Sequence, residues 1–263
     1  MSDDDCSDPS VVEWKGKHLM MTACDDGRRR VYESGDKGES WTEALGTLSR
    51  VWGNDQKRHE KGIGSGFITA KIENRDVMLV TVPVYSNRKG NERAELHLWL
   101  TDNTHIADIG PVSGNDDAAA SSLLYKSAGS GDNNEENKEG LIALYEKRGG
   151  GQSPGMVSVR LTEQLKRVKE VLATWKKVDD RVSKLCLTSR AAVSALTENA
   201  CTTDKITDGL VGSFVRQIFF GITWMDEYLG VNATVKKGTE KKVTSTEKGV
   251  TFRGAWVEWP VGQ

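Results

Sequence analysis

The sequence lacks the features that mark membrane-spanning, metal-binding and nucleic-acid-binding proteins. No run approaches the roughly eighteen apolar residues needed to cross a bilayer, and the N-terminus, MSDDDCSDPS, has no apolar signal-peptide stretch. The 4 cysteines form no CxxC pair and the 4 histidines have no metal-ligand spacing, so neither a metal nor a cofactor is predicted. The net charge of -2 creates no field that would attract nucleic acid.

Two features typical of exported proteins are nevertheless present. Cys186 and Cys201 flank a polar loop and are candidates for a local disulfide; the alternative is a pair of unpaired thiols. Asn232 begins the sequon Asn-Ala-Thr and is a candidate for N-glycosylation. Both features conflict with the missing signal peptide.

The spacing of apolar residues changes once along the chain. From Val11 to Tyr145, short apolar runs such as HLMMTA, GFITAKI and DVMLVTVPVY are separated by Gly, Asn and Asp, which predicts an antiparallel all-β sandwich, barrel or propeller. After residue 158 the apolar residues recur at three- and four-residue steps, which predicts a long helix with one packing face. That face is predicted to contain Leu161, Leu165, Val168, Leu172, Trp175, Val178, Val182 and Leu185.

The octet SGDKGESW, residues 34–41, fits the Asp-box pattern S-x-D-x-G-x-S/T-W through Ser34, Asp36, Gly38 and Trp41. We expect the Asp36 carboxylate to accept hydrogen bonds from backbone N–H groups of a tight hairpin. Gly38 is expected to adopt a positive φ, and Trp41 to fold back into the sheet core. Such a hairpin presents neither a nucleophile nor a pair of carboxylates. It is therefore predicted to be structural, and it is typical of bladed β folds.

Several segments in collinear order resemble the trypanosomal trans-sialidase superfamily over nearly the whole chain. They are CSDPSVVEWKGK, RRRVYESGDKGESWTEALGTLSRVWG, LHLWLTDN, SSLLYK, VLATWKKVDDRVSKLC, DGLVG and DEYLGVNAT. The resemblance implies a mainly β fold: the second half of a six-bladed sialidase β-propeller, a long connecting α-helix and the start of a lectin-like β sandwich. The implied boundaries are 1–157 for the partial propeller, 158–186 for the helix, 187–230 for a junction segment with a loop, and 231–263 for the incomplete lectin-like domain.

Catalysis in this family uses a tyrosine nucleophile assisted by a glutamate, three arginines that hold the sialate carboxylate, and an aspartic acid/base. By the resemblance, Asp8 in Cys-Ser-Asp-Pro occupies the glutamate position with a side chain that is one methylene shorter. Ala120, in AAASSLLYK, occupies the position of the nucleophile. Tyr125 lies five residues further along the same strand and is expected to point to the opposite face.

The arginine and aromatic positions are only partly retained. Ala23 replaces one arginine of the trio, whereas Arg93 retains another and is a candidate contact for the sialate carboxylate. Asn91 replaces the tryptophan against which an acceptor sugar stacks in active trans-sialidases. Residues 213–222 also depart from the family pattern.

These replacements predict a non-catalytic trans-sialidase-like surface glycoprotein, or a fragment of one. Its role would be host-cell glycan or matrix binding, immune exposure and virulence, with sialylated or other host-surface glycoconjugates or matrix proteins as partners. The family is secreted or held at the cell surface by a lipid anchor, and neither a signal peptide nor an anchor signal is found in this sequence. A chain that starts inside the propeller would explain the missing signal peptide. The alternatives are an active exo-α-sialidase or trans-sialidase, and a decayed gene copy without independent function.

Overall fold

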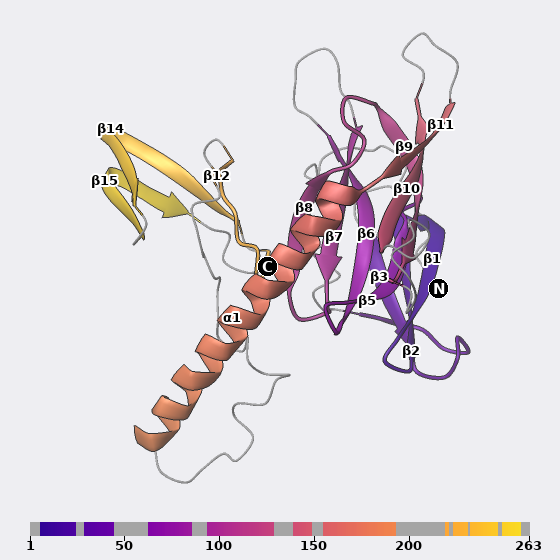
Figure 1. Ribbon diagram of the computed structural model, residues 1–263, viewed down its shortest axis with the longest axis horizontal. Coiled ribbons are helices and arrows are strands. Elements are labelled where there is room, and N and C mark those ends of the chain that lie inside the picture. Colours follow the sequence, from indigo (N-terminus) through magenta and orange to yellow (C-terminus); the bar gives the residue numbers. More distant parts are fainter. Residues whose placement is uncertain are drawn as a thin grey trace. The chain divides into compact units, whose positions relative to one another are not determined.

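The computed structural model divides into two compact units, Met1–Leu172 and Ala173–Gln263 (Figure 1). The structure describes residues 6–24, 29–44, 63–85, 94–128, 139–148, 155–192, 219–220, 223–230, 232–246 and 249–258. The first unit contains three antiparallel sheets and the beginning of a long helix. The second contains the rest of that helix and one further sheet.

Each of the three sheets in the first unit is a meander, in which successive strands pair side by side (Figure 1). The first sheet consists of β1 (Cys6–Trp14), β2 (Lys17–Cys24), β3 (Arg29–Ser34) and β4 (Thr42–Glu43). The second sheet consists of β5 (Phe67–Ile72), β6 (Arg75–Tyr85), β7 (Ala94–Thr101) and β8 (Ile106–Pro111). The third sheet consists of β9 (Ala118–Lys126), β10 (Gly140–Lys147) and β11 (Gly155–Arg160).

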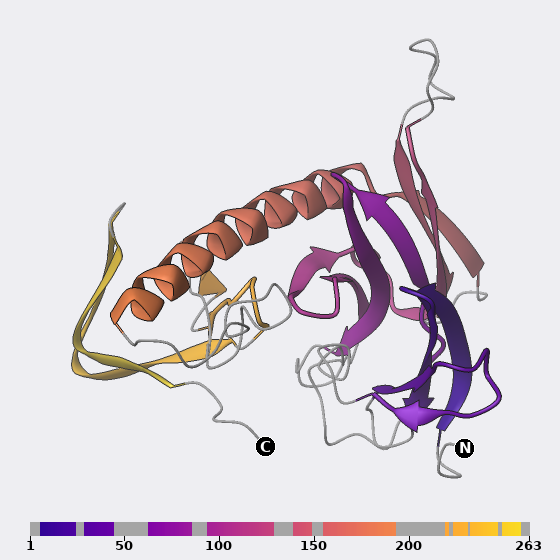
Figure 2. The same ribbon diagram turned by 90° about the horizontal axis from the view of Figure 1, so that it is seen from below.

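The three sheets are arranged as neighbouring blades of a propeller-type fold. Strand β5 contacts both β1 and β9, so the first strands of the three sheets lie side by side. Figure 2 shows the sheets next to one another in this unit. Repetition of small antiparallel sheets around their first strands is the arrangement of propeller blades. The prediction of a mainly β, propeller-type fold is confirmed.

The second sheet is covered on both of its faces, and its sequence reflects this. Every side chain from Val77 to Pro83 in β6 is buried, whether it points to one face or to the other. A strand covered on only one face would alternate apolar and polar residues, whereas a strand buried on both faces is apolar throughout. The run VMLVTVP is therefore explained by the position of β6 between two other sheets.

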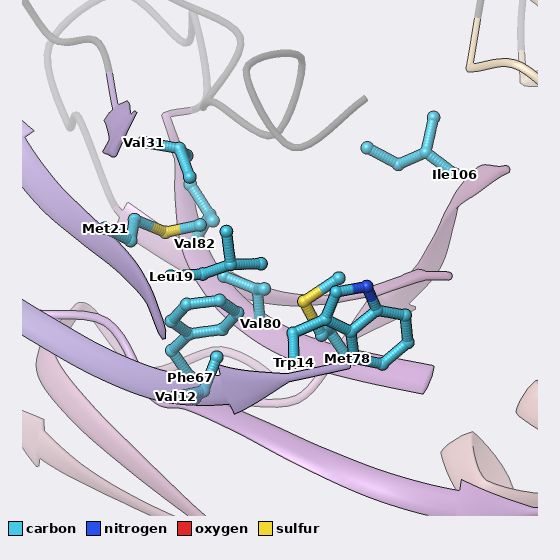
Figure 3. Packing of buried hydrophobic residues seen from close by; sticks show 10 residues of the cluster. All are labelled: Val12, Trp14, Leu19, Met21, Val31, Phe67, Met78, Val80, Val82 and Ile106. Carbon is cyan, nitrogen blue, oxygen red and sulfur yellow. The ribbon is translucent and has the colours of Figure 1, made fainter. Parts of the chain in front are cut away.

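A hydrophobic core fills the space between the first and second sheets (Figure 3). The first sheet contributes Val12, Trp14, Leu19, Met21 and Val31, and the second contributes Phe67, Met78, Val80, Val82 and Ile106. All ten side chains are at most 9% exposed. Burial of this much apolar surface is the main stabilising contribution that joins the two sheets.

The second and third sheets meet through a tighter, partly polar contact at Gly66. The Gly66 N–H donates to the Thr81 hydroxyl at 2.8 Å, and the Thr81 N–H donates to the Gly66 carbonyl at 2.9 Å. The Thr81 and Ser121 hydroxyls are 2.8 Å apart and share a hydrogen bond. A Cβ on Gly66 would lie 2.9 Å from Leu123 Cγ, so only glycine allows the two sheets to approach this closely.

Helix α1 (Thr162–Ala192) begins four residues later than the predicted start at 158 and extends beyond the predicted end at 186. Residues 158–160 belong instead to β11, because Arg160 pairs with Ile142 of β10. Six of the eight residues predicted for the apolar face are buried: Leu161, Leu165, Val168, Leu172, Trp175 and Val178. Val171 is buried as well, Val182 is half-buried, and the side chain of Leu185 lies outside the described residues. No helix among the described residues has the length and apolarity that a membrane crossing requires.

The second unit contains a four-stranded sheet in the order β12 (Phe219–Phe220), β13 (Thr223–Trp224), β14 (Ala233–Thr246) and β15 (Gly249–Glu258). A turn between β13 and β14 packs against α1. The Tyr228 hydroxyl donates to Asp179 at 2.7 Å, and the Trp175 indole N–H donates to the carbonyl of Glu227. Most of the segment predicted as a junction, 187–230, lies outside the described residues.

Candidate functional site

A cleft of about 720 Å³ opens at one end of the three sheets of the first unit. It is lined by Asp8 of β1, Ile63 and Gly64 before β5, Ala119 and Ala120 of β9, and residues 146–148 and 155–156 of the β10–β11 hairpin. Cavities of a few hundred to about a thousand Å³ are typical of small-ligand sites. The cleft therefore has the size for a sugar, and it contains two positions singled out from the sequence, Asp8 and Ala120.

A β-bulge places Asp8 at the cleft. The pairing of β1 with β2 shifts by one residue between Ser7 and Ser10, and Asp8 adopts a φ of 51°. Aspartate is among the few non-glycine residues that occupy this left-handed region readily, and bulges redirect a side chain out of the regular alternation. The carboxylate accepts a hydrogen bond from the Ser7 hydroxyl at 3.0 Å and is exposed to solvent.

Ala120 faces Asp8 across Gly64. A Cβ placed on Gly64 would lie 3.7 Å from the Cβ of Asp8 and 4.0 Å from the Cβ of Ala120. The two positions are distant in sequence, and the contact of β5 with both β1 and β9 brings them together. At Ala120 the cleft receives only a methyl group, which can neither attack a sugar nor donate a hydrogen bond.

Tyr125, the tyrosine nearest in sequence to the nucleophile position, does not line the cleft. Its hydroxyl donates to Glu139 at 2.7 Å and to the carbonyl of Lys71 at 3.3 Å. Burial and the neighbouring Glu139 carboxylate raise the pKa of Tyr125 above its ordinary value. A phenol that is turned away from the cleft and harder to ionise is a poor substitute for a nucleophile.

The basic side of the cleft is formed by the end of β10. Lys147 forms an ion pair with Asp116 at 2.6 Å, and Asp116 also accepts a hydrogen bond from the Tyr145 hydroxyl at 2.9 Å. Burial and the Asp116 carboxylate raise the pKa of Tyr145 to about 12. The Arg148 N–H donates to the carbonyl of Asp117 at 2.8 Å, and the Arg148 side chain is exposed. Lys147, which is paired with Asp116, and Arg148 place two cations at the cleft, and Asp8 and Glu146 place two carboxylates there, so the lining carries no net charge.

The remaining predicted ligand positions either do not line the cleft or lie outside the described residues. Ala23 is buried in β2 and pairs with Ser7 on one side and Arg29 on the other. Asn91 and Arg93 lie outside the described residues, so their predicted roles stay predictions. The same is true of the candidate disulfide, since Cys201 and the side chain of Cys186 lie outside the described residues.

A disulfide joins Cys6 to Cys24, and the sequence analysis missed it. The register of the β1–β2 hairpin explains why. Pairing advances by one residue on each strand from Trp14–Lys17 to Ser10–Met21, and the same progression would place Cys6 opposite residue 25. The bulge at Asp8 shifts the pairing by one residue and brings Cys24 opposite Cys6. The disulfide lies two residues before Asp8 and fixes the edge of the cleft. The sequence does contain a signal for this disulfide: the turn Lys15-Gly16 joins two strands, and each strand has a cysteine at the end that is distant from the turn.

The Asp box forms the β3–β4 hairpin, at the opposite end of the first sheet from the cleft. Asp36 accepts hydrogen bonds from the Ser40 N–H at 2.9 Å, the Ser40 hydroxyl and the Ser34 hydroxyl at 2.7 Å. These bonds, those from Ser40 above all, hold the pKa of Asp36 well below its usual range. Gly38 has a φ of 94°. Trp41 is half-buried and packs on Gly38, with its indole N–H donating to the Gly38 carbonyl, and is not part of the buried core.

The titratable groups of the second sheet form structural contacts. His97 lies 2.9 Å from Asp108, and His105 lies 2.9 Å from Asp102, which also pairs with Arg75 at 2.8 Å. Burial alone would lower the pKa of His97, but the carboxylates of Asp108 and Glu95 together outweigh it and raise the pKa. No group of three or more His, Cys, Asp or Glu side chains in the described part of the chain could hold a metal ion.

The fold and the cleft define a class: a propeller-type protein with a cleft at the ends of its first strands. A family profile for the BNR repeat-like domain matches residues 1–146, more than half of the chain, and the profile of the trans-sialidase C-terminal domain matches residues 206–263. The chain belongs to the trypanosomal trans-sialidase superfamily.

Relatives of known sequence and structure agree with this assignment. The chain is 35% identical over 243 residues to Sialidase 85-1.1 of Trypanosoma cruzi, covering 90% of this chain and 28% of that protein. It is 41% identical over 177 residues to another T. cruzi sialidase, covering 66% of this chain and 14% of that protein. Trypanosoma rangeli sialidase superposes with a TM-score of 0.67 at 34% identity, over 99% of this chain and 38% of that one.

A further solved structure is that of T. rangeli sialidase in complex with 2,3-difluorosialic acid, as a covalent intermediate. It matches with a TM-score of 0.68 at 35% identity. It covers 99% of this chain and 38% of that chain. The chain thus spans well under half the length of the relatives that it matches.

Proposed function

We propose that this chain is a non-catalytic member of the sialidase family that binds sialylated or other host-surface glycoconjugates through the cleft. The observation that carries the proposal is the pairing of Asp8 with Ala120 across Gly64. The position opposite the acidic residue carries a methyl group where a covalent mechanism needs a nucleophilic oxygen. A cleft of this size, with charged side chains at its rim but without that oxygen, is suited to recognition.

Two carboxylates, those of Asp8 and Glu146, and two cations line the cleft, so its lining has no net charge and an acidic sugar would be held by the cations alone. Lys147 and Arg148 offer cationic donors, and Ala119, Ala120 and Met156 offer an apolar wall for a sugar face. The Cys6–Cys24 disulfide supports an oxidising compartment, and hence secretion or display at the cell surface. At such a surface the sequon at Asn232 would be available for glycosylation, and host glycans or matrix proteins would be the partners.

Two assays on the same preparation test the proposal. We expect saturation-transfer NMR to detect binding of sialyllactose but not of lactose, and a fluorogenic sialoside to show no turnover above buffer. Ala120→Trp fills the cleft and should abolish the transfer signal. Tyr125→Phe removes a hydroxyl that points away from the cleft and should leave the signal unchanged.

Two outcomes would overturn the proposal. Turnover of the sialoside that disappears in Asp8→Ala would make the chain an enzyme. Absence of any transfer signal from sialyllactose to the folded wild-type chain would remove the recognition role.

A further inference from the structure

The connection between β8 and β9, residues 112–117, continues the hydrogen bonding of β7 beyond the end of β8. Pairing of β7 with β8 ends at Pro111. Beyond that point the Val112 N–H donates to the Leu96 carbonyl at 2.7 Å, and the Leu96 N–H donates to the Ser113 hydroxyl at 2.9 Å. The connection therefore supplies the partners that a longer β8 would have supplied to the first residues of β7.

Asp117 ends this connection and supplies the next partner of β7. The Ala94 N–H donates to Asp117 Oδ1 at 2.9 Å. Ala94 is 1% exposed, and a buried backbone N–H that lacks a partner is costly. In an antiparallel sheet the N–H groups of alternate residues point to the same edge of a strand, so those of Leu96 and Ala94 need partners on the same side. The Asp117 carboxylate takes the place of a main-chain carbonyl there.

Asp117 also holds the end of β10. The Arg148 N–H donates to the Asp117 carbonyl at 2.8 Å. The preceding residue, Asp116, is bonded to the same strand, through its ion pair with Lys147 at 2.6 Å and the hydrogen bond from the Tyr145 hydroxyl at 2.9 Å. Asp117 is therefore bonded to the second sheet through its side chain and to the third sheet through its main chain.

The strands that Asp117 joins carry residues of the cleft lining. Strand β9 begins directly after Asp117, and its residues Ala119 and Ala120 line the cleft, as does Arg148 at the end of β10. Asp117 itself is half-buried and does not line the cleft. It can therefore influence a bound ligand only through the positions of these neighbours.

We infer that Asp117 is a positioning residue of the cleft, an inference that rests on the proposed function. Its two bonds hold the ends of β7, β9 and β10 in one arrangement before a ligand arrives, so binding does not have to order them. The carboxylate acts here as a hydrogen-bond acceptor and not as a charge. Asparagine, whose side-chain oxygen accepts a hydrogen bond in the same way, should replace it, and alanine should not.

Titration with sialyllactose, followed by saturation-transfer NMR, tests this role with three variants. We expect Asp117→Ala to weaken binding about tenfold, the fold-change that corresponds to one hydrogen bond to a charged group. Asp117→Asn keeps the acceptor and should bind within about twofold of the wild type. Tyr125→Phe loses a hydrogen bond to Glu139 at the other end of β9 and controls for stability. Its urea midpoint should fall as that of Asp117→Ala does, with wild-type binding.

The outcomes separate this inference from the proposed function. A wild-type chain that gives no transfer signal overturns both, whereas wild-type binding that Asp117→Ala leaves unchanged overturns the inference alone. Equal weakening in Asp117→Ala and Asp117→Asn also contradicts it, because that result assigns the effect to the charge. Hydrogen exchange on the wild-type chain needs no variant: the Ala94 amide should be protected without sialyllactose, and an amide that becomes protected only after its addition contradicts a prearranged cleft.

Discussion

Substituting Gly66 by alanine tests the contact between the second and third sheets. A Cβ at this position would lie 2.8 Å from Thr81 Oγ1, 2.9 Å from Leu123 Cγ and 3.0 Å from the Leu123 backbone nitrogen. Atoms do not approach a Cβ this closely, and the neighbours have little room to move: Thr81 is fully buried and one of the clashing atoms is backbone. The methyl group therefore has to push β5 away from β9.

The cost follows from two contributions. Overpacking a filled site costs about 1–3 kcal/mol, and weakening the 2.8 Å bond from the Gly66 N–H to the Thr81 hydroxyl adds about 1 kcal/mol. We expect Gly66→Ala to lower the free energy of unfolding of the first unit by about 2–4 kcal/mol. For a unit of this size, that loss lowers the melting temperature by about 4–16 °C.

Gly64→Ala is the matched control, two residues earlier in the same segment. Its Cβ would meet nothing closer than 3.7 Å, which is ordinary van der Waals contact, and Gly64 does not adopt a positive φ. We expect a change within about 0.5 kcal/mol. Urea unfolding read by hydrogen exchange of the β5 and β9 amides reports on the first unit alone. The reasoning fails if Gly66→Ala unfolds at the wild-type midpoint, or if both alanines cost the same.

Two further variants test the edge of the cleft and a half-buried ion pair. Replacing both Cys6 and Cys24 by serine should lower the free energy of unfolding by about 3 kcal/mol, since the disulfide closes a loop with a sequence separation of 18; the measurement is urea unfolding, and an unchanged midpoint contradicts it. Asp108→Asn should cost about 1 kcal/mol near pH 5.5 and little near pH 8.5. The raised pKa of His97 means that its stabilisation is present below its unfolded pKa and is lost as the pH rises through its folded pKa. Equal losses in urea midpoint at both pH values would refute the ion pair.

Much of the fold was accessible from the sequence because its determinants are local. Strand and helix periodicities depend on residues a few positions apart, so six of the eight residues predicted for the apolar face of the helix are buried. The helix begins later than predicted, because the pairing of Arg160 with Ile142 keeps the chain extended for a few more residues. Pairing with a distant strand is invisible to a local pattern.

The cleft was less accessible, since it depends on contacts between distant segments. The resemblance to the trans-sialidase superfamily singled out Asp8 and Ala120, but only the packing of β1 and β9 on β5 places them across Gly64. The charged residues Glu146, Lys147 and Arg148 at the rim gave no sequence signal, because surface charges are common and their convergence on a cleft is a property of the fold.

The sequence by itself determined the class of fold, the hairpin built around Asp36 and the membership of a family, since each depends on short motifs and local periodicity. Tertiary structure decided the pairing of Cys6 with Cys24, because a one-residue bulge changes the register of a whole hairpin. It also decided which apolar faces are covered. Alternation in β10 makes both of its faces apolar, but only the packing of the sheets leaves Ile142 and Leu144 exposed and Leu141 buried.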